Sequence, residues 1–234
     1  MSPTNHFLPR LSLKSVWQNR KQYYLDQQGL ALPSISTILN ATKPAEDWER
    51  LMNWKQRVGA VEASRIAATA SRRGTGTHRQ IERYLAGEAI DCPDGVKPYW
   101  ESIQPVLQEI DAVRLLESPV LHYDVGYAGQ VDCVASYQGT PCICEWKTAD
   151  RPKESWEGLY DYPLQVVAYC GAVNHSYQNY GLQVNHGLLV IALPDQAAEI
   201  FWFEPDTIRK YWQQWHQRVL TYQRRQARSP KSYL

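Results

Sequence analysis

Asp132, Glu145 and Lys147 lie on two neighbouring apolar segments with a short turn between them. Side chains alternate between the faces of a strand, so Glu145 and Lys147 point the same way and Trp146 points the opposite way. A cross-strand contact can bring Asp132 to the face of Glu145 and Lys147. Two carboxylates beside a lysine form a site for a hard divalent cation next to a charged donor, and that chemistry suits phosphodiester hydrolysis.

These residues need a β-hairpin to position them, and the sequence around them predicts one. Residues 114–123, 127–137 and 141–147 read as three consecutive strands, with Gly126 and Gly139 in the turns. Two further strands are expected at 187–193 and 199–203. The predicted helices span 33–39, with Ser34 or Ser36 as its cap, and 46–58, 60–70, 77–86, 97–113, 163–174 and 205–222. This order predicts an α/β fold, a mixed central sheet flanked by helices.

The domain organisation expected from these elements is simple. Residues 33–222 form one domain, which is mainly helical over 33–113 and contains the sheet and the closing helices over 114–222. Residues 1–32 are expected to be an irregular N-terminal extension, and residues 223–234 a basic flexible tail. The stretch 73–76, which contains two glycines, is expected to interrupt the helical region before residue 77.

The hairpin residues belong to a longer pattern. Gly76-Thr77-His78 precedes Asp132 and Glu145-Trp146-Lys147, and a QxxxY segment from Gln165 to Tyr169 follows them. In this order the motifs resemble the PD-(D/E)xK nuclease superfamily, in particular its RecB-type branch and the mitochondrial genome maintenance exonuclease group. The similarity covers roughly residues 33 to 222 and implies a restriction-endonuclease-like core with an N-terminal helical region.

The resemblance assigns roles to the central residues. Asp132, Glu145 and the backbone carbonyl of Trp146 would hold Mg²⁺ or Mn²⁺, and Lys147 would orient the attacking water or stabilise charge on the phosphate. His78 would bind a second metal ion or contact the reacting phosphate. Many relatives carry Asp in place of Glu145, but Glu is common in the superfamily. The alternative for Lys147 is a salt bridge to one of the two acids.

Supporting roles follow for a second group of residues. Gln165 and Tyr169 are neighbours on one helix face and would hold the lysine and the nucleic-acid backbone; the alternative is an ordinary pair on an amphipathic helix. Glu82, one turn after His78, and Glu117 are candidate supporting acids, and Glu82 reads equally well as a solvated acid. Three arginines are expected to contact nucleic acid: Arg72, Arg73 and Arg79. The alternative is that they form an ordinary solvated helix face.

Composition limits the remaining possibilities. The net charge of +1 gives no strongly basic footprint, although a carboxylate-rich site offsets basic grooves in that total. Nine Trp and fifteen Tyr supply mostly packing surface, and some could stack on unpaired bases. The five cysteines contain no CxxC, which argues against a disulfide framework, a zinc site or the iron–sulfur cluster found in some relatives. His175 and His186 are expected to be structural.

The function expected from the sequence is a metal-dependent exonuclease that acts on free ends or flaps of single-stranded DNA in repair or replication. The alternatives are an endonuclease with the same core and a catalytically inert DNA-binding module, against which the intact Asp132, Glu145 and Lys147 argue. No apolar run is long enough to span a membrane. We expect a monomer in the cytoplasm of a bacterial or phage-like source; an organellar location is the alternative, because residues 1–25 are basic and lack acids.

Overall fold

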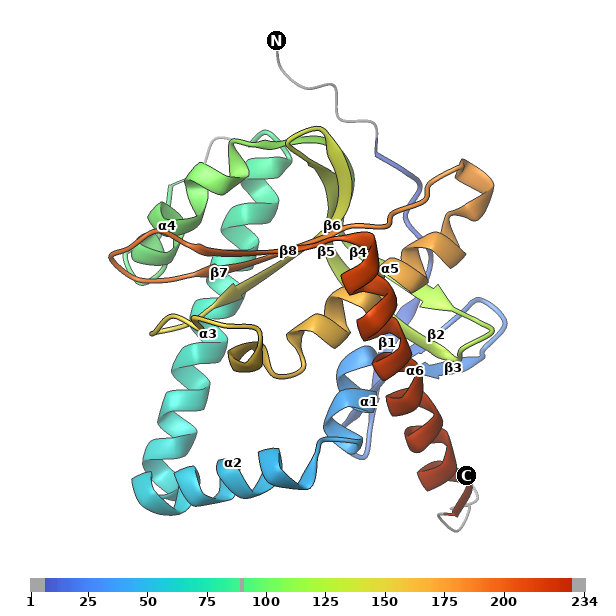
Figure 1. The fold of residues 1–234 in the computed structure, drawn as a ribbon, viewed down its shortest axis with the longest axis horizontal. Helices are drawn as coiled ribbons and strands as arrows, with labels where there is room; N and C mark the ends of the chain where they lie inside the picture. The colour runs from blue at the N-terminus through green and yellow to red at the C-terminus, as the bar shows by residue number, and fades with distance from the viewer. Residues whose placement is uncertain (1–6, 89–90, 229–234) are drawn as a thin grey trace.

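The computed structural model describes residues 7–88 and 91–228. A five-stranded sheet forms its centre, in the order β4-β5-β6-β7-β8 (Figure 1). Strands β4, β5 and β6 form an antiparallel meander, β6 pairs with β7 in parallel, and β7 pairs with β8 antiparallel. The expected mixed sheet is therefore confirmed. The strands span Ile110–His122, Tyr127–Tyr137, Thr140–Thr148, Gly187–Ala192 and Glu199–Phe203.

Helices cover both faces of this sheet. Helices α5 (Tyr162–Ser176) and α6 (Pro205–Arg228) bury apolar side chains against residues such as Val131, Val134 and Ile143. On the opposite face, α3 (Ala60–Leu85) and α4 (Lys97–Leu107) pack against Trp146 and the buried cysteines of β5 and β6. As the alternation predicts, Cys142 and Cys144 share the face of Trp146, so Glu145 projects to the other face.

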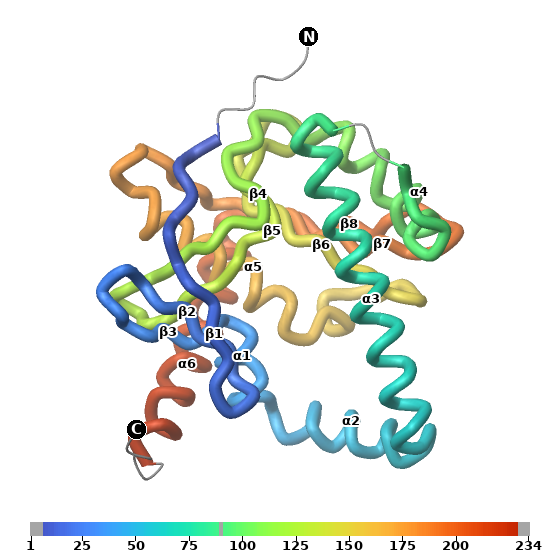
Figure 2. The backbone as a smooth tube through the Cα atoms, turned by 180° about the vertical axis from the view of Figure 1, so that it is seen from behind, coloured from blue at the N-terminus to red at the C-terminus, as the bar shows by residue number. Residues whose placement is uncertain are grey.

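The N-terminal helices reach away from the sheet. Helix α1 (Ile35–Ala41) begins at Ser34, whose hydroxyl accepts a 3.0 Å hydrogen bond from the Thr37 backbone N–H, and its buried residues join the core. Helix α2 (Ala45–Val58) has no buried residue and spans the distance between α1 and α3 (Figures 1 and 2). Gly59, with a φ of 86°, makes the corner before α3.

The predicted break at residues 73–76 is wrong, because α3 runs through it as one continuous helix. The glycines there serve packing instead. A Cβ on Gly76 would lie 2.6 Å from a methyl carbon of Val96, so only glycine lets this helix approach the start of α4 so closely. The propensity cost of two glycines is offset by the burial of the helix face that contains Ile81 and Leu85.

The N-terminal extension is also different from the prediction. Instead of an irregular segment, residues 14–33 form an antiparallel sheet of β1 (Lys14–Gln18), β2 (Lys21–Leu25) and β3 (Ala31–Pro33). Its core side chains, Tyr24 and Leu32, pack on Leu121 and Ala128 of the main sheet. Most residues of these strands are partly exposed, and many of them are polar. The sequence therefore lacks the apolar alternation that would predict strands here.

Two other boundaries differ from expectation. The helix predicted over 97–113 ends at Leu107, two residues after Pro105, and β4 begins at Ile110. Helix α6 continues to Arg228, so residues 223–228 of the expected flexible tail are helical, and residues 229–234 lie outside the described chain. Two short 3₁₀ turns, η1 (Glu157–Leu159) and η2 (Gln178–Tyr180), flank α5.

Candidate active site

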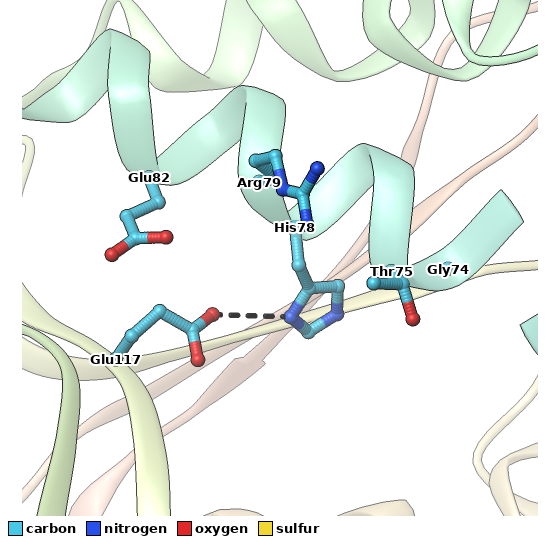
Figure 3. A pocket seen from close by; sticks show the side chains of 6 residues that line it. All are labelled: Gly74, Thr75, His78, Arg79, Glu82 and Glu117. Carbon is cyan, nitrogen blue, oxygen red and sulfur yellow. Dashed lines mark hydrogen bonds and ion pairs between the residues drawn. The ribbon is translucent and has the colours of Figure 1, made fainter. Parts of the chain in front are cut away.

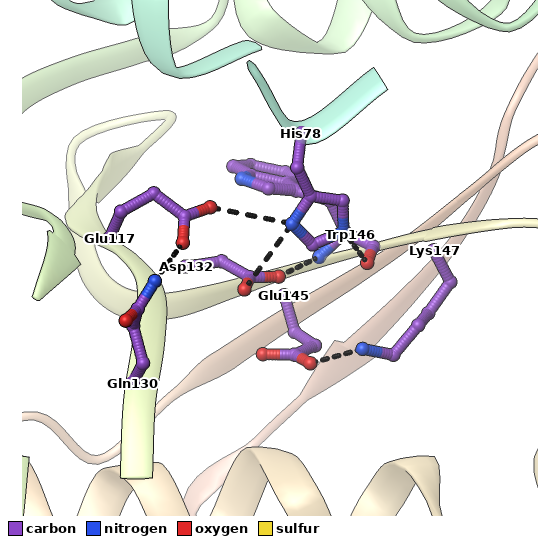
Figure 4. Close-up of polar contacts among 7 residues, drawn as sticks. All are labelled: His78, Glu117, Gln130, Asp132, Glu145, Trp146 and Lys147. Atoms are coloured by element: carbon purple, nitrogen blue, oxygen red, sulfur yellow. Dashed lines mark hydrogen bonds and ion pairs between the residues drawn. The ribbon is translucent and has the colours of Figure 1, made fainter. Parts of the chain in front are cut away.

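Asp132 and Glu145 are held side by side by the register of β5 and β6. The pair Cys133 and Cys144 fixes that register, so Asp132 lies next to Glu145 on the adjoining strand. One carboxylate oxygen of Asp132 accepts a 2.9 Å hydrogen bond from the backbone N–H of Trp146 (Figure 4). Both acids are almost fully buried, at 7% and 1% exposure.

Glu145 and Lys147 form an ion pair on the same side of β6. Burial, together with the negative charge of Asp132, raises the pKa of Glu145 to about 7. Its second oxygen, Oε2, is buried and has no hydrogen-bond partner within the described chain. Burial alone would lower the pKa of Lys147, but the charges of Glu145 and Asp132 outweigh it and raise that pKa, so the lysine remains protonated.

His78 extends from α3 to the edge of this carboxylate pair. Its Nε2 lies 2.9 Å from the carbonyl oxygen of Trp146, and its Nδ1 lies 3.4 Å from Glu117 and 3.5 Å from Asp132. Burial opposes the charged imidazolium, yet the negative charges of Asp132 and Glu117 raise the pKa of His78 to about 9. A protonated ring donates from both nitrogens, which matches an acceptor on each side.

Glu117 belongs to the site more directly than the sequence indicated. It lies on β4 between the pairs Leu116–Cys133 and Ser118–Val131, so it faces Asp132 across the strands. Its backbone has a φ of 41°, a strained conformation for a side chain of this size. Burial favours its neutral form, but hydrogen bonds with His78 and Gln130 outweigh burial and lower the pKa of Glu117.

Gln130 is a further residue of the site that the sequence did not indicate. Its amide donates a 2.6 Å hydrogen bond to the second carboxylate oxygen of Glu117 (Figure 4). The available signal was its place two residues before Asp132, which puts both side chains on one face of β5. Gln130 therefore orients Glu117 toward His78.

A cleft of about 400 Å³ opens along α3 beside these residues. His78, Arg79, Glu82 and Glu117 line it together with Gly74 and Thr75 (Figure 3). Burial and the nearby charge of Glu117 raise the pKa of Glu82. The cleft gives a substrate access to His78 and Glu117 from the solvent.

The QxxxY residues and the arginines differ in their relation to the site. Tyr169 is buried on α5, and burial together with the charges of Glu145 and Asp132 raises the pKa of its hydroxyl; Gln165 is half-buried one turn earlier. Arg79 lines the cleft and Arg72 is exposed, whereas Arg73 binds Asp150, Thr148 and Tyr99. The three arginines therefore do not form a single free surface.

The donor set fits a hard divalent cation. Asp132, Glu145 and the Trp146 carbonyl offer oxygen ligands, the type that Mg²⁺ and Mn²⁺ prefer. The unpartnered Glu145 Oε2 is a buried anionic oxygen that a cation would satisfy. Ligand atoms of His78, Glu117 and Asp132 also lie within 4.8 Å of one another, which offers a second grouping around the shared Asp132.

Comparison with known proteins places this geometry in context. The sequence model of the PD-(D/E)XK nuclease superfamily matches residues 49–231. Mitochondrial genome maintenance exonuclease 1 of Xenopus tropicalis is 36% identical over 86% of this chain and 60% of its own length. The mouse protein of that name is 37% identical over 84% of this chain and 60% of its length, and the human one 35% over 82% and 58%.

This chain thus spans about 60% of the length of the curated relatives that it matches. Within residues 7–88 and 91–228, no helix is both long and apolar enough to cross a membrane.

Proposed function

Because this chain belongs to the PD-(D/E)XK nuclease superfamily, we propose that it hydrolyses phosphodiester bonds with the help of a divalent metal ion. The observation that carries the proposal is the buried Glu145 carboxylate, which lies between Asp132 and Lys147 and leaves one oxygen without a partner. A buried anion of this kind costs free energy unless a cation or a donor satisfies it. A metal ion would provide that compensation at Oε2, the oxygen that the ion pair between Oε1 and Lys147 leaves without a partner.

Asp132, Glu145 and the carbonyl of Trp146 are the proposed ligands of Mg²⁺ or Mn²⁺. When bound, the metal would lower the pKa of a water molecule and polarise the phosphate. Asp132 is held in place for this role by the Trp146 N–H. The hydrogen bond between His78 and the Trp146 carbonyl links the imidazole to the same ligand set.

Lys147 and His78 would act on the phosphate. Lys147 remains protonated beside Glu145 and stabilises negative charge that develops on the phosphoryl oxygens. His78, which lines the cleft and lies 2.9 Å from the Trp146 carbonyl, adds a second side chain that would contact the phosphate. Glu117 and Gln130 position the His78 ring. Tyr169, with Gln165 beside it, would support the ligand strands from α5.

The proposed substrate is a single strand of DNA with a free end. The support is the name of the relatives, which calls them exonucleases, and the helical region of α1, α2 and α3, which extends away from the sheet (Figure 1). Arg72 and Arg79 would contact phosphates along α3. That name also favours an organellar location over a cytoplasmic one, and we expect the protein to act as a monomer.

The experiment compares three single-stranded DNA substrates in Mg²⁺ or Mn²⁺: a linear strand, the same strand with bulky protein on both ends, and a closed circle. An exonuclease digests the open linear strand and spares the other two. Rapid cutting of the circle or of the doubly blocked strand contradicts the exonuclease proposal and supports the endonuclease alternative. The absence of cleavage of every strand, with binding retained, would support the inert module.

A further inference from the structure

Positive side chains and tyrosine rings alternate along a path that begins at Lys147. The Lys147 ammonium lies 5.4 Å from the ring centre of Tyr162, and the Lys153 ammonium lies 6.0 Å from the ring centres of both Tyr162 and Tyr160. At the far end, the guanidinium of Arg50 lies 5.5 Å from the Tyr160 ring centre. The path therefore connects the catalytic lysine to helix α2.

The segment that carries Lys153 and Tyr160 is fixed to the sheet rather than loosely attached. The Glu199 carboxylate on β8 accepts hydrogen bonds from the backbone N–H groups of Lys153, at 2.6 Å, and Glu154, at 2.9 Å. A Cβ on Gly158 would come 2.4 Å from the Lys153 carbonyl oxygen, so the loop closes tightly at this glycine. The Trp156 ring packs on Phe203 at 4.8 Å between ring centres. These contacts make the loop a rigid support.

Tyr160, which lies on this loop, is unusual in its exposure and in its backbone conformation. The residue is 57% exposed and its φ is 52°, a positive value that a bulky residue rarely adopts. Backbone strain of this kind tends to persist where it positions a functional side chain. The ring lines a cavity of about 370 Å³ at α2, which is otherwise lined by Lys43, Asp47, Arg50, Leu51 and Trp54.

The chemistry of that cavity suits one nucleotide of a single strand. The indole of Trp54 and the phenol of Tyr160 are flat apolar surfaces on which bases of any sequence can stack. Lys43 and Arg50 bring positive charge to the same cavity. Asp47, 2.5 Å from Arg50, balances part of that charge, so a phosphate would compete with it for the guanidinium.

We infer that the path Lys147–Tyr162–Lys153–Tyr160–Arg50 is a binding track for single-stranded nucleic acid, with Tyr160 as its base-stacking subsite at α2. The inference rests on the proposed function and extends it, because it assigns a binding position to a nucleotide other than the one that is cleaved. Lys153 and Arg50 contact phosphates, while Tyr160 holds a base. A strand that follows the track leads directly to Lys147 and Glu145.

The test measures the affinity of the full chain for a single-stranded oligonucleotide. The parent protein and all variants carry Glu145→Gln, so that bound strands stay intact. Tyr160→Ala should weaken binding about 5- to 150-fold, the loss expected for one base–aromatic stack. Tyr160→Phe should retain most of the affinity, whereas Tyr160→Leu, which keeps apolar bulk without a ring, should behave like the alanine variant. Tyr180 supplies a matched control, because it is 56% exposed on η2 and lies outside the track.

A second arm removes the base instead of the ring. Oligonucleotides with one abasic site at successive positions should show a single position at which the parent protein loses affinity, and Tyr160→Ala should be insensitive at that position. Equal affinities of Tyr160→Ala and the parent, or a loss that Tyr180→Ala reproduces, would overturn the track and leave the proposed function standing. A wild-type chain that neither binds nor cleaves single strands would overturn both.

Discussion

Asp132 and Trp146 are joined by a hydrogen bond in which the backbone N–H of Trp146 donates to a carboxylate oxygen of Asp132 at 2.9 Å. The carbonyl of the same Trp146 lies 2.9 Å from Nε2 of His78. One peptide segment of β6 thus fixes an acid from β5 through its donor and a histidine from α3 through its acceptor. The position of Trp146 in the chain, between Glu145 and Lys147, is what brings three elements together.

Substitutions of Asp132 can separate its proposed role as a metal ligand from its role as the acceptor of the Trp146 N–H. Asp132→Asn keeps an oxygen that accepts from Trp146 but removes the charge, so we expect near wild-type thermal stability and a loss of turnover of orders of magnitude. Asp132→Ala leaves a buried N–H without an acceptor and should also lower the free energy of unfolding by about 1–3 kcal/mol. Thermal unfolding and cleavage rates on the purified variants check this. Equal stability of the two variants would show that the hydrogen bond is not structural.

Lys147 should be needed for chemistry but not for metal binding. Lys147→Ala removes the charge that faces the phosphate, and we expect a loss of cleavage on the order of 100- to 1000-fold or more. Because Asp132 and Glu145 remain, titration calorimetry with Mn²⁺ should still detect binding to the variant. A variant that cleaves normally, or that no longer binds the metal, would contradict this division of roles.

The two neighbouring arginines of α3 should behave differently. Arg73 donates to Thr148 at 3.1 Å and to Tyr99 at 3.0 Å and pairs with Asp150, so Arg73→Gln should lower the free energy of unfolding by about 1–3 kcal/mol. Arg72 is exposed, and Arg72→Gln should change stability by less than about 0.5 kcal/mol.

Arg72→Gln should instead reduce the slope of log affinity against log salt by about one unit, because one phosphate contact is lost. The readouts are chemical denaturation and single-strand binding at several salt concentrations. An unchanged salt slope would leave Arg72 as an ordinary surface residue.

Strand alternation explains why the central site could be predicted from the sequence. The acids and the lysine lie on a hairpin whose parity fixes their common face, and the buried cysteines and Trp146 mark the other face. Glu117 and Gln130 were harder to assign. Their contact depends on a register across β4 and β5 and on an unusual φ at Glu117, which no local pattern encodes.

The same contrast holds for the fold. The sheet and α5 follow from apolar runs, but the continuous α3 and the N-terminal sheet do not. At Gly76 the decisive fact is the close approach of Val96, a tertiary contact that overrides the usual effect of glycine on a helix. For β1 and β2, most side chains stay partly exposed, so the hydrophobic alternation that reveals a strand is weak.

His122 should make the folded state less favourable as the pH falls into mild acid. Burial, followed by the nearby charges of His175 and His216, lowers the pKa of His122 to about 4, and the charge of Asp124 opposes this only partly. The unfolded chain, with a histidine pKa near 6.5, therefore binds more protons than the folded chain between pH 6.5 and 4. The contribution of His122 to the free energy of unfolding should fall as the pH drops through this window, whereas the raised pKa of Glu145 makes an opposite contribution between about pH 7 and 4.5.

His122→Gln removes this group, so the stability of the variant relative to the wild type should rise as the pH drops from 6.5 to 4.5. The measurement is the thermal midpoint of both proteins at half-unit steps from pH 7 to pH 4.5. Parallel declines in the two proteins would place the acid sensitivity elsewhere.

The most direct test of the account is whether Glu145 and a divalent cation are jointly needed to cut a strand. End-labelled linear single-stranded DNA is incubated with the wild-type chain and with Glu145→Gln, each in Mg²⁺, in Mn²⁺ and in EDTA. The account predicts cleavage by the wild type with either metal, none in EDTA, and a loss of orders of magnitude in the folded variant. Cleavage that continues in EDTA, or undiminished cleavage by Glu145→Gln, would contradict it.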